Sequence, residues 1–388
     1  MNWQQYWSIA PEITFLNHGA FGACPKPVLA EQQRLRSQLE QDPVKFFSHD
    51  FEPLLDRTRS QLADFVGVNA EDLVFVSNAT TGVNTVLRSL HFQPGEELLT
   101  TNHEYNASRN ALDFVAERAN ARIVVAPVPF PLESSDQIIA AVTERISSKT
   151  KLVLLDHLTS QTALVFPIEK LISELTKLGI DTLIDGAQAP GNIPVNLQQL
   201  GATYYTGNCH KWLLSPKGAA FLYVRPDKQQ QIRPLVISHG ANSPRTDKSR
   251  FQIEFDWIGT DDPTAYLSVP TALDFINTRL DSGWPELMAK NHCLAVKARQ
   301  IICQQLAVSL PCPNQAIASM ASIPLPDIVD KFPANQLQNT LYNKYSIQVP
   351  IFYFLPNQQW LLRISAQIYN TEAHYQKLAN ALTELLNF

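Results

Sequence analysis

Short apolar runs alternate with longer amphipathic stretches between residues 73 and 185, and this alternation predicts an α/β fold. The expected strands are Leu73–Val76, Glu97–Thr101, Arg122–Pro127, Leu152–Asp156 and Thr182–Asp185. The expected helices between them are Thr81–Leu90, Ala107–Arg118, Ser135–Ile146 and Ile168–Leu178. Short apolar strands that alternate with helices are typical of a mostly parallel sheet covered by helices on both faces. Ligands bind at the carboxyl ends of the strands in such a sheet.

The pattern changes on both sides of this region. Before it, helices are expected at residues 28–41 and Phe51–Val66. After it, we expect a strand at Ala202–Tyr205, helices at Ala265–Leu280, Pro285–Leu306 and Glu372–Leu386, and strands at Ala318–Ile323, Gln348–Phe354 and Trp360–Ile364. We therefore predict an N-terminal segment, 1–15, that packs with a small C-terminal α+β domain, 266–388, and a large domain, 16–265, that holds the ligand.

Length and charge narrow the class of protein. A chain of 388 residues with 45% hydrophobic residues has enough core for two domains. The net charge of −5, with basic and acidic residues mixed along the chain, argues against a nucleic-acid partner. The chain has no apolar run of membrane-spanning length and no signal-peptide pattern at its start. Five cysteines without a CxxC pair fit a reducing cytoplasm and predict no metal site. We expect a cytoplasmic protein.

Lys211 stands in the unusual stretch Thr206–Trp212, just past a predicted strand and directly behind His210. Most lysines are solvated surface charges, but small and polar neighbours surround this one. A lysine held in a partly buried pocket loses its proton easily and acts as an amine nucleophile toward an aldehyde. The first cofactor to test is therefore pyridoxal phosphate, which such a lysine holds as a Schiff base.

Two further strand ends offer groups that this cofactor needs. Ser77–Gly82 follows a buried strand and begins a helix, so its hydroxyls and free amides form a phosphate cradle or, alternatively, an ordinary helix cap. Asp185 ends another buried strand, where a carboxylate needs a cationic partner such as a protonated pyridine nitrogen; its alternative role is a helix cap. Between them, Tyr105 can stack on the ring, with His103 in reserve, or lie exposed in a loop.

These motifs, in this order, resemble the class V aminotransferase family of pyridoxal-phosphate fold type I. The resemblance rests on Asn78–Gly82, Asp185–Gln188 and His210–Lys211, on Trp257–Thr260, and on Arg363–Ser365 near the C-terminus. The opening Phe15–Gly22 also resembles the family's N-terminal loop on the substrate side. The match covers nearly the whole chain, and its motifs are jointly specific although each is weak alone.

The resemblance implies a role for each matching residue. Lys211 becomes the Schiff-base lysine, Asp185 the partner of the ring nitrogen, and Gln188 a contact of the ring O3′. The cofactor-binding set is Ala79, Thr80, Thr81, Tyr105, Ser160, Asp185, Gln188, Asn208, His210, Lys211 and Thr260, where Thr260 reaches the phosphate of the partner subunit in a homodimer. The substrate-binding set is Asn17, His18, Gly19 and Arg363, with Arg363 as a bidentate carboxylate fork. Lys211, Asp185 and Tyr105 are the expected catalytic residues.

The reaction stays open between three types. Phe15–Gly19, Pro43–Phe47 and His157–Thr162 most resemble isopenicillin N epimerase-like proteins. A cysteine or cystine C–S lyase and an aminotransferase are the alternatives, and a binding protein without catalysis is disfavoured by the intact Lys211 and Asp185. Epimerisation needs a second acid or base opposite Lys211, for which Tyr105, His18 and Asn17 are the candidates.

Other residues bear on the substrate. The region 345–359 contains no cysteine, which disfavours a desulfurase. Cys24, Cys209 and Cys312 are expected to pack as small apolar residues. Arg245, Lys248 and Arg250 either recognise a distal carboxylate of a long substrate or belong to a solvated loop.

Overall fold

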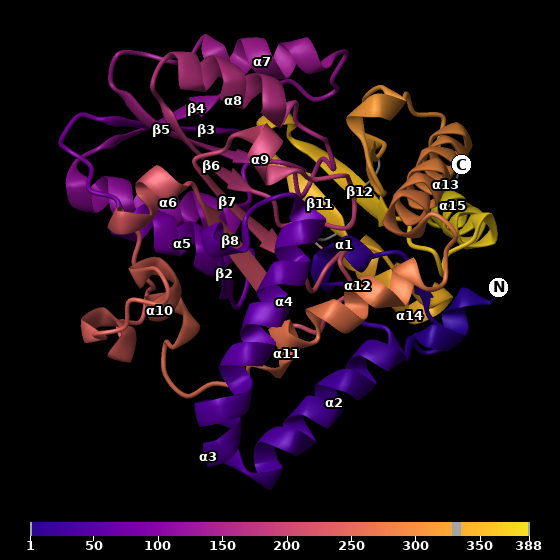
Figure 1. The fold of residues 1–388 in the computed structure, drawn as a ribbon. Coiled ribbons are helices and arrows are strands. Elements are labelled where there is room, and N and C mark those ends of the chain that lie inside the picture. The colour runs from indigo at the N-terminus through magenta and orange to yellow at the C-terminus, as the bar shows by residue number, and fades with distance from the viewer. Residues whose placement is uncertain (1, 328–334, 387–388) are drawn as a thin grey trace.

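A seven-stranded sheet forms the centre of the computed structural model, which describes residues 2–327 and 335–386. Its spatial order is β2-β8-β7-β6-β5-β3-β4, and only β8 runs antiparallel to its neighbours. The strands are β2 (Leu73–Val76), β3 (Glu97–Thr101), β4 (Arg122–Ala126), β5 (Thr150–Asp156), β6 (Asp181–Asp185), β7 (Tyr204–Asn208) and β8 (Ala220–Val224). The predicted mostly parallel sheet is confirmed (Figure 1).

Alternate residues of the strands face two different helical layers. In β5, Leu152 and Leu154 join the cluster that contains α5 (Ala79–Ser89), α6 (Asn106–Ala119) and α10 (Arg250–Asp256). Val153 and Leu155 join the larger cluster with α7 (Ser135–Thr143) and α8 (Ile168–Lys177). Because successive side chains of a strand point to opposite faces, a continuous apolar strand is buried on both sides.

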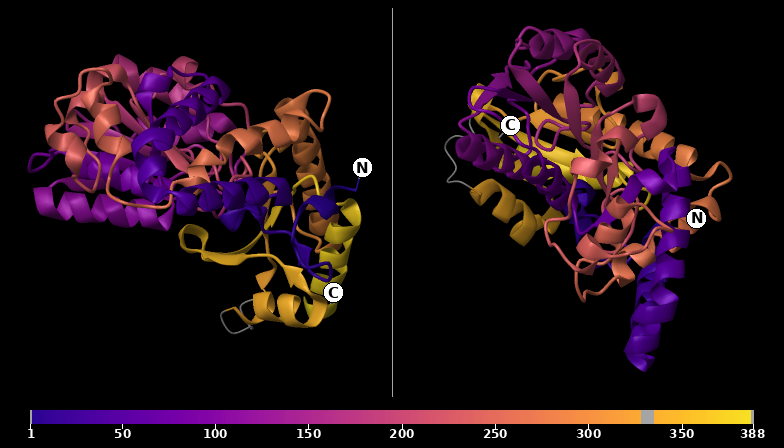
Figure 2. Two further views of the ribbon diagram at one scale, coloured as in Figure 1. Left: turned by 60° about the horizontal axis from the view of Figure 1, so that its bottom comes forward. Right: turned by 60° about the vertical axis from the view of Figure 1, so that its left-hand side comes forward.

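The remaining described strands form two smaller sheets, built from the N- and C-terminal parts of the chain (Figures 1 and 2). A three-stranded antiparallel sheet has the order β11 (Ile351–Phe354), β12 (Gln359–Ser365), β9 (Met320–Pro324), and a two-stranded parallel sheet pairs β1 (Thr14–Phe15) with β10 (Ile347–Gln348). The other α-helices are α1 (His18–Phe21), α2 (Lys26–Gln41), α3 (Pro43–Lys45), α4 (Phe51–Val66), α9 (Leu197–Leu200), α11 (Thr264–Leu267), α12 (Val269–Asn277), α13 (Gly283–Gln305), α14 (Gln336–Tyr345) and α15 (Glu372–Leu386).

The first residues of the chain contact its last third. β1 pairs with β10, and the ring of Trp7 lies 4.9 Å from that of Tyr369. Meanwhile α12 contacts both α2 and α4, so the region after residue 265 also packs on helices from the start of the chain. The division into segments 1–15, 16–265 and 266–388 stays a prediction. Within residues 2–327 and 335–386, no helix has the length and apolarity that a bilayer crossing requires.

Two predicted elements differ from the structure, and one strand of the central sheet was not predicted. The single helix expected at Ala265–Leu280 is wrong, because α11 and α12 are separate helices with a proline at the start of α12 and a Ser268 hydroxyl on the Thr264 carbonyl. The single strand expected at Gln348–Phe354 is also wrong, because the chain changes sheets between β10 and β11. Strand β8 was not expected, although it supplies the antiparallel neighbour of β7.

The packing of β5 generates a stability test. Leu154 is fully buried in the middle of the sheet, whereas Leu178, at the end of α8, is 60% exposed. We expect Leu154→Ala to lower the free energy of unfolding by about 2–5 kcal/mol, because it removes apolar contacts and leaves a cavity. Leu178→Ala is the matched control and should change the same quantity by less than about 0.5 kcal/mol. Urea denaturation of both variants measures this difference, and equal losses would contradict the two-layer packing.

Candidate active site

The candidate residues converge at the carboxyl ends of the parallel strands. Asp156 and Asp185 are the last residues of β5 and β6 and are direct partners in the register of the two strands. Lys211 follows the end of β7 by three residues. Arg363, from β12, is close enough to lower the pKa of Lys211 through its charge. The structure therefore brings together four residues that are separated by up to 207 positions in the sequence, from Asp156 to Arg363.

The Lys211 amine is set apart by its surroundings. Desolvation, together with the nearby charge of Arg363, lowers its pKa to about 8, against the opposing charges of Asp185 and Asp156. At pH 7 about a tenth of such amines are neutral, compared with about one in three thousand for an unperturbed lysine. Lys211 is in no salt bridge among the described residues. Its side chain therefore has the properties of an amine nucleophile.

Asp185 is buried and held by neutral donors. The Ser108 hydroxyl donates to its Oδ2 at 2.8 Å, and the Ala187 amide donates to its Oδ1 at 3.0 Å. Burial raises the pKa of Asp185, while these two donors and Lys211 oppose the rise. Among residues that the structure describes, it forms no salt bridge. Its carboxylate can therefore pair with a protonated ring nitrogen.

Two acidic residues beside Asp185 were not expected to belong to the site. Carboxylate oxygens of Glu104, Asp156 and Asp185 lie within 4.8 Å of one another. Burial and the neighbouring carboxyls raise the pKa of Asp156 and bring that of Glu104 to about 8. Buried like charges this close cannot all ionise, so the cluster retains protons near neutral pH. Asp156 ends a predicted strand just as Asp185 does, and this signal was available in the sequence.

The start of α5 offers fewer free amides than the motif suggests. The helix begins at Ala79 rather than at Thr81, and Asn78 caps it by accepting the Thr81 amide at 2.8 Å. The Ala79 amide donates to Asn208 Oδ1, also at 2.8 Å. The Thr80 amide and the Asn208 Nδ2 group have no hydrogen bond in the described structure. These groups suit an anion at a helix N-terminus.

Two other predicted phosphate contacts lie in different surroundings. His210 is partly buried, and its Nδ1 lies 3.2 Å from the Ala219 carbonyl, which leaves Nε2 without a bond among the described residues. Thr260 is exposed in the loop after Trp257. Its predicted contact with a partner subunit stays a prediction.

Arg363 is buried and partly satisfied by the chain. Its Nη1 donates to the Ser160 carbonyl at 2.7 Å, and its Nη2 donates to Asn17 Oδ1 at 3.2 Å. Its Nε is buried without a partner among the described residues. Burial lowers its pKa to about 10, so the guanidinium remains charged at neutral pH. A substrate carboxylate fits this incompletely bonded cation.

His18 does not fit the expected contact with substrate. It is fully buried, and its Nδ1 and Nε2 lie 2.8 Å from the Tyr369 hydroxyl and 3.1 Å from the Lys211 carbonyl. Burial lowers its pKa to about 3. Gly19 is likewise buried, with its amide on Ser365 Oγ and its carbonyl on the Gln188 side chain. The polar groups of these two residues are therefore bonded within the protein and hold neighbouring parts of the site together.

The side chains expected around the cofactor ring differ in their burial and in the hydrogen-bonding groups that they leave unused. Gln188 donates to the Gly19 carbonyl at 2.7 Å and accepts from Trp212 Nε1 at 2.8 Å, so one amide N–H remains. Tyr105 precedes α6 and is 44% exposed. His103, the reserve choice for stacking, is buried, with its ring nitrogens close to Thr162 Oγ1 and the Val128 carbonyl. His103 is therefore the poorer choice.

The three named cysteines are buried. Burial raises the pKa of Cys24 to about 12 and that of Cys209 still further. Cys312 accepts a hydrogen bond from Arg299 at 3.1 Å, and burial raises its pKa as well. The reactive form of cysteine is the thiolate, so none of these thiols is suited to attack at neutral pH.

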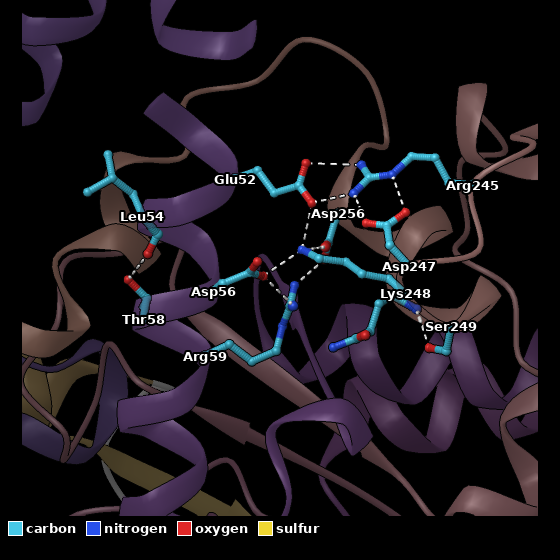
Figure 3. A network of polar contacts seen from close by, with 11 residues as sticks. Glu52, Leu54, Asp56, Thr58, Arg59, Arg245, Asp247, Lys248, Ser249 and Asp256 are labelled. Atoms are coloured by element: carbon cyan, nitrogen blue, oxygen red, sulfur yellow. Dashed lines mark hydrogen bonds and ion pairs between the residues drawn. The ribbon is translucent and has the colours of Figure 1, made fainter. Parts of the chain in front are cut away.

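The three cations proposed for a distal carboxylate, which lie just before α10 and at its first residue, are already paired. Figure 3 shows Lys248 among the carboxylates of Glu52, Asp56 and Asp256, at 2.6–3.4 Å. Arg245 pairs with Glu52 at 2.6 Å and with Asp247 at 2.5 Å. Arg250 pairs with Glu254 at 3.5 Å. The network ties this loop to α4, so the hypothesis of a distal-carboxylate site loses its candidate cations.

Comparisons with known proteins agree with this geometry. Residues 15–378 match the profile described as aminotransferase class-V. An isopenicillin N epimerase of Amycolatopsis lactamdurans is 32% identical, covering 99% of this chain and 98% of that protein. An L-cysteine desulfhydrase of Arabidopsis thaliana is 29% identical, covering 96% and 88%. A solved cystine C–S lyase in complex with cysteine persulfide shares the fold, with a TM-score of 0.81, 21% identity, and coverage of 96% and 98%.

The lowered pKa of Lys211 generates a pH prediction. Only the neutral amine attacks the aldehyde, so the rate at which cofactor-free protein captures pyridoxal phosphate should rise with pH and level off above about pH 8. Nα-acetyl-lysine is the reference, because it exposes the same cofactor to an amine with an ordinary pKa of about 10.4. Stopped-flow absorbance measures both profiles, and coincident midpoints would contradict the assigned environment of Lys211.

Proposed function

Because the chain belongs to the class-V aminotransferase family of pyridoxal-phosphate enzymes, we propose that it acts on L-cysteine as a C–S lyase. The observation that carries this choice is the position of His18. Its ring is buried with both nitrogens bonded, so it is no second acid or base at the substrate. Elimination needs a single amine that takes one proton and gives one back, and Lys211 suffices for that.

In this proposal the chain holds the cofactor through the groups already described. Lys211 binds its aldehyde carbon, Asp185 its ring nitrogen, Tyr105 its ring face and Gln188 its O3′ atom. The phosphate lies against Ala79, Thr80, Thr81, Asn208 and His210, with Thr260 supplied by the partner in a homodimer and Ser160 at the substrate side. When bound, pyridoxal phosphate withdraws electrons from the substrate Cα.

The chemistry of the chain then follows from two side chains. Arg363 binds the α-carboxylate through the capacity left at its guanidinium, which orients the Cα–H bond. Once the substrate amine has displaced Lys211 from the cofactor, the freed neutral Lys211 amine takes the Cα proton. The electron pair forms a Cα–Cβ double bond, and the Cβ–S bond breaks. The departing sulfur receives the proton from the Lys211 ammonium. The 2-aminoacrylate that remains hydrolyses with water to pyruvate and ammonia, so the net products are sulfide, pyruvate and ammonia.

The size of the substrate supports the same choice. An epimerase for a long dicarboxylic peptide needs a cation for the distal carboxylate. Arg245, Lys248 and Arg250, the candidates for that role, are paired within the chain. Cysteine carries a single carboxylate, for which Arg363 is sufficient. The buried Cys312, bonded to Arg299, likewise disfavours a persulfide route through that thiol.

Epimerisation remains the second candidate. It is favoured by the 32% identity to an isopenicillin N epimerase over nearly the whole chain. Of the three candidates for the acid or base opposite Lys211, His18 and Asn17 are bonded within the chain, so Tyr105 remains. The sequence alone favoured this reaction, and the burial of His18 reverses the preference. Amino-group transfer would leave the cofactor as an amine, which product analysis distinguishes.

The choice of reaction is tested with L-cysteine. We expect equal amounts of sulfide and pyruvate, and a loss of about 10²–10⁴-fold in kcat for Lys211→Ala because the general base is removed. Lys149→Ala, the same change at an exposed lysine, is the control.

Tyr105→Phe separates the two candidates, because it keeps the ring and removes the hydroxyl. A lyase should keep its kcat within about threefold, since one group at Lys211 suffices. D-amino acid formation without pyruvate, abolished in Tyr105→Phe, would establish the epimerase instead.

The role of Arg363 generates a separate prediction. Arg363→Gln keeps donors for Asn17 but removes the charge, so KM for L-cysteine should rise by about 10- to 100-fold, the usual cost of losing a charged hydrogen bond. The affinity for pyridoxal phosphate should stay within about threefold. Steady-state kinetics and cofactor titration measure the two quantities, and an unchanged KM would exclude Arg363 as the carboxylate ligand.

A further inference from the structure

The loop of residues 16–22, called the N-terminal loop below, joins two parts of the site. On one side, the Ser365 amide donates to the Leu16 carbonyl at 2.8 Å, and the Gly19 amide donates to Ser365 Oγ at 3.1 Å. On the other side, Lys217 Nζ donates to the Gly22 carbonyl at 2.9 Å. Gly22 has φ +71° and lies so close to the main chain before Lys211 that an added Cβ would be 2.1 Å from the His210 carbonyl. This contact requires glycine.

The main chain at Lys211 lies outside the strands and makes few hydrogen bonds. The strand β7 ends at Asn208, and the amides of Cys209 and His210 both reach the Ala219 carbonyl. The Lys211 carbonyl accepts from the Leu214 amide at 3.2 Å, within the same turn. Among hydrogen bonds in residues 2–327 and 335–386, His18 makes the one contact to this carbonyl from outside that turn, at 3.1 Å.

The hydrogen-bond partners assign the tautomer of His18. A carbonyl oxygen only accepts, so Nε2 carries the hydrogen and donates to Lys211. Nδ1 is then the acceptor, and the Tyr369 hydroxyl donates to it at 2.8 Å. The amide nitrogen of Gln367, 3.4 Å from Nε2, is the more distant neighbour. The ring also packs against Trp212, with 4.8 Å between centroids.

We propose that Tyr369, His18 and the Lys211 carbonyl form a positioning relay. The Lys211 carbonyl sets the His18 tautomer, the Tyr369 hydroxyl donates to Nδ1 and so orients the ring, and His18 then holds the main chain of the reactive lysine. Tyr369 lies four residues past the end of β12, which carries Arg363, so the relay links the lysine to the carboxylate-binding part of the chain. The relay rests on Lys211 as the cofactor lysine, and it holds for elimination and epimerisation alike.

The relay is tested by variants that separate hydrogen bonding from packing. Tyr369→Phe keeps the aromatic ring and removes the donor to Nδ1; we expect kcat to fall by about 5- to 10-fold with KM unchanged, because Arg363 keeps its own contacts. His18→Leu removes both bonds and should cost about 10- to 100-fold in kcat. His18→Gln restores a donor at the position of Nε2 and should recover most of that loss. Tyr375→Phe removes a buried hydroxyl that donates to the Ser365 carbonyl, and it controls for a general loss of stability.

Two spectroscopic measurements do not depend on turnover. In the loaded protein, the pH midpoint of the visible absorption band should shift in Tyr369→Phe and His18→Leu but not in Tyr375→Phe. In the cofactor-free protein, ¹⁵N NMR of labelled histidine, assigned with His18→Gln, should show His18 neutral with its hydrogen on Nε2 at pH 7. Tyr369→Phe should shift the Nδ1 signal, because that nitrogen loses its hydrogen-bond donor.

The outcomes distinguish the relay from the proposed function. A wild-type protein that binds no pyridoxal phosphate refutes the proposed function, while the NMR measurement still decides the relay. A cofactor-loaded, active wild type refutes the relay if Tyr369→Phe matches it in kcat and absorption midpoint. Equal defects in His18→Gln and His18→Leu, a hydrogen on Nδ1, or an imidazolium at pH 7 also refute it.

Discussion

Desolvation of the Lys211 amine is the constraint on which the rest of the site depends. A lysine in water keeps its proton at neutral pH, whereas burial and the charge of Arg363 bring the pKa of Lys211 to about 8. Asp185 and Asp156 oppose this shift, so the amine lies between a guanidinium and a group of carboxyls whose balance sets its charge. Asp185 can remain the charged member of that group because Ser108 and Ala187 donate to it. The fold meets this constraint by placing the ends of β5, β6 and β7 side by side.

The N-terminal loop makes hydrogen bonds to both sides of this arrangement. It bonds to β12 through Ser365 and to the lysine turn through His18 and Gly22, and Arg363 on β12 contacts Asn17 of the same loop. A segment near residue 20 therefore holds Lys211 and Arg363 relative to each other. This explains why His18 and Gly19 are buried: their polar groups are used within the protein and are not offered to substrate.

The parallel sheet and the partly buried setting of Lys211 could be predicted from the sequence because they rest on local patterns. The apolar strand Leu73–Val76 lies where expected, since burial on both faces requires a continuous apolar run. The surroundings of single side chains could not be predicted. His18 stands in a motif that resembles a substrate loop, but its burial follows from Tyr369, 351 residues later. Asp156, by contrast, lies in the site but was not predicted there. It ends a strand as Asp185 does, but its closeness to Asp185 depends on the order of the strands in the sheet, which no local pattern reveals.

The same limit applies to the reaction. Relatives with epimerase and desulfhydrase names match the chain about equally well, so identity alone leaves the chemistry of this site open. The central claim beneath both reactions is that Lys211 carries the cofactor. Borohydride reduction of the pyridoxal-phosphate-loaded protein, followed by mass spectrometry of its peptides, tests it most directly. The account predicts one phosphopyridoxyl group, attached to Lys211; the same group on another lysine, or no attached group, would contradict it.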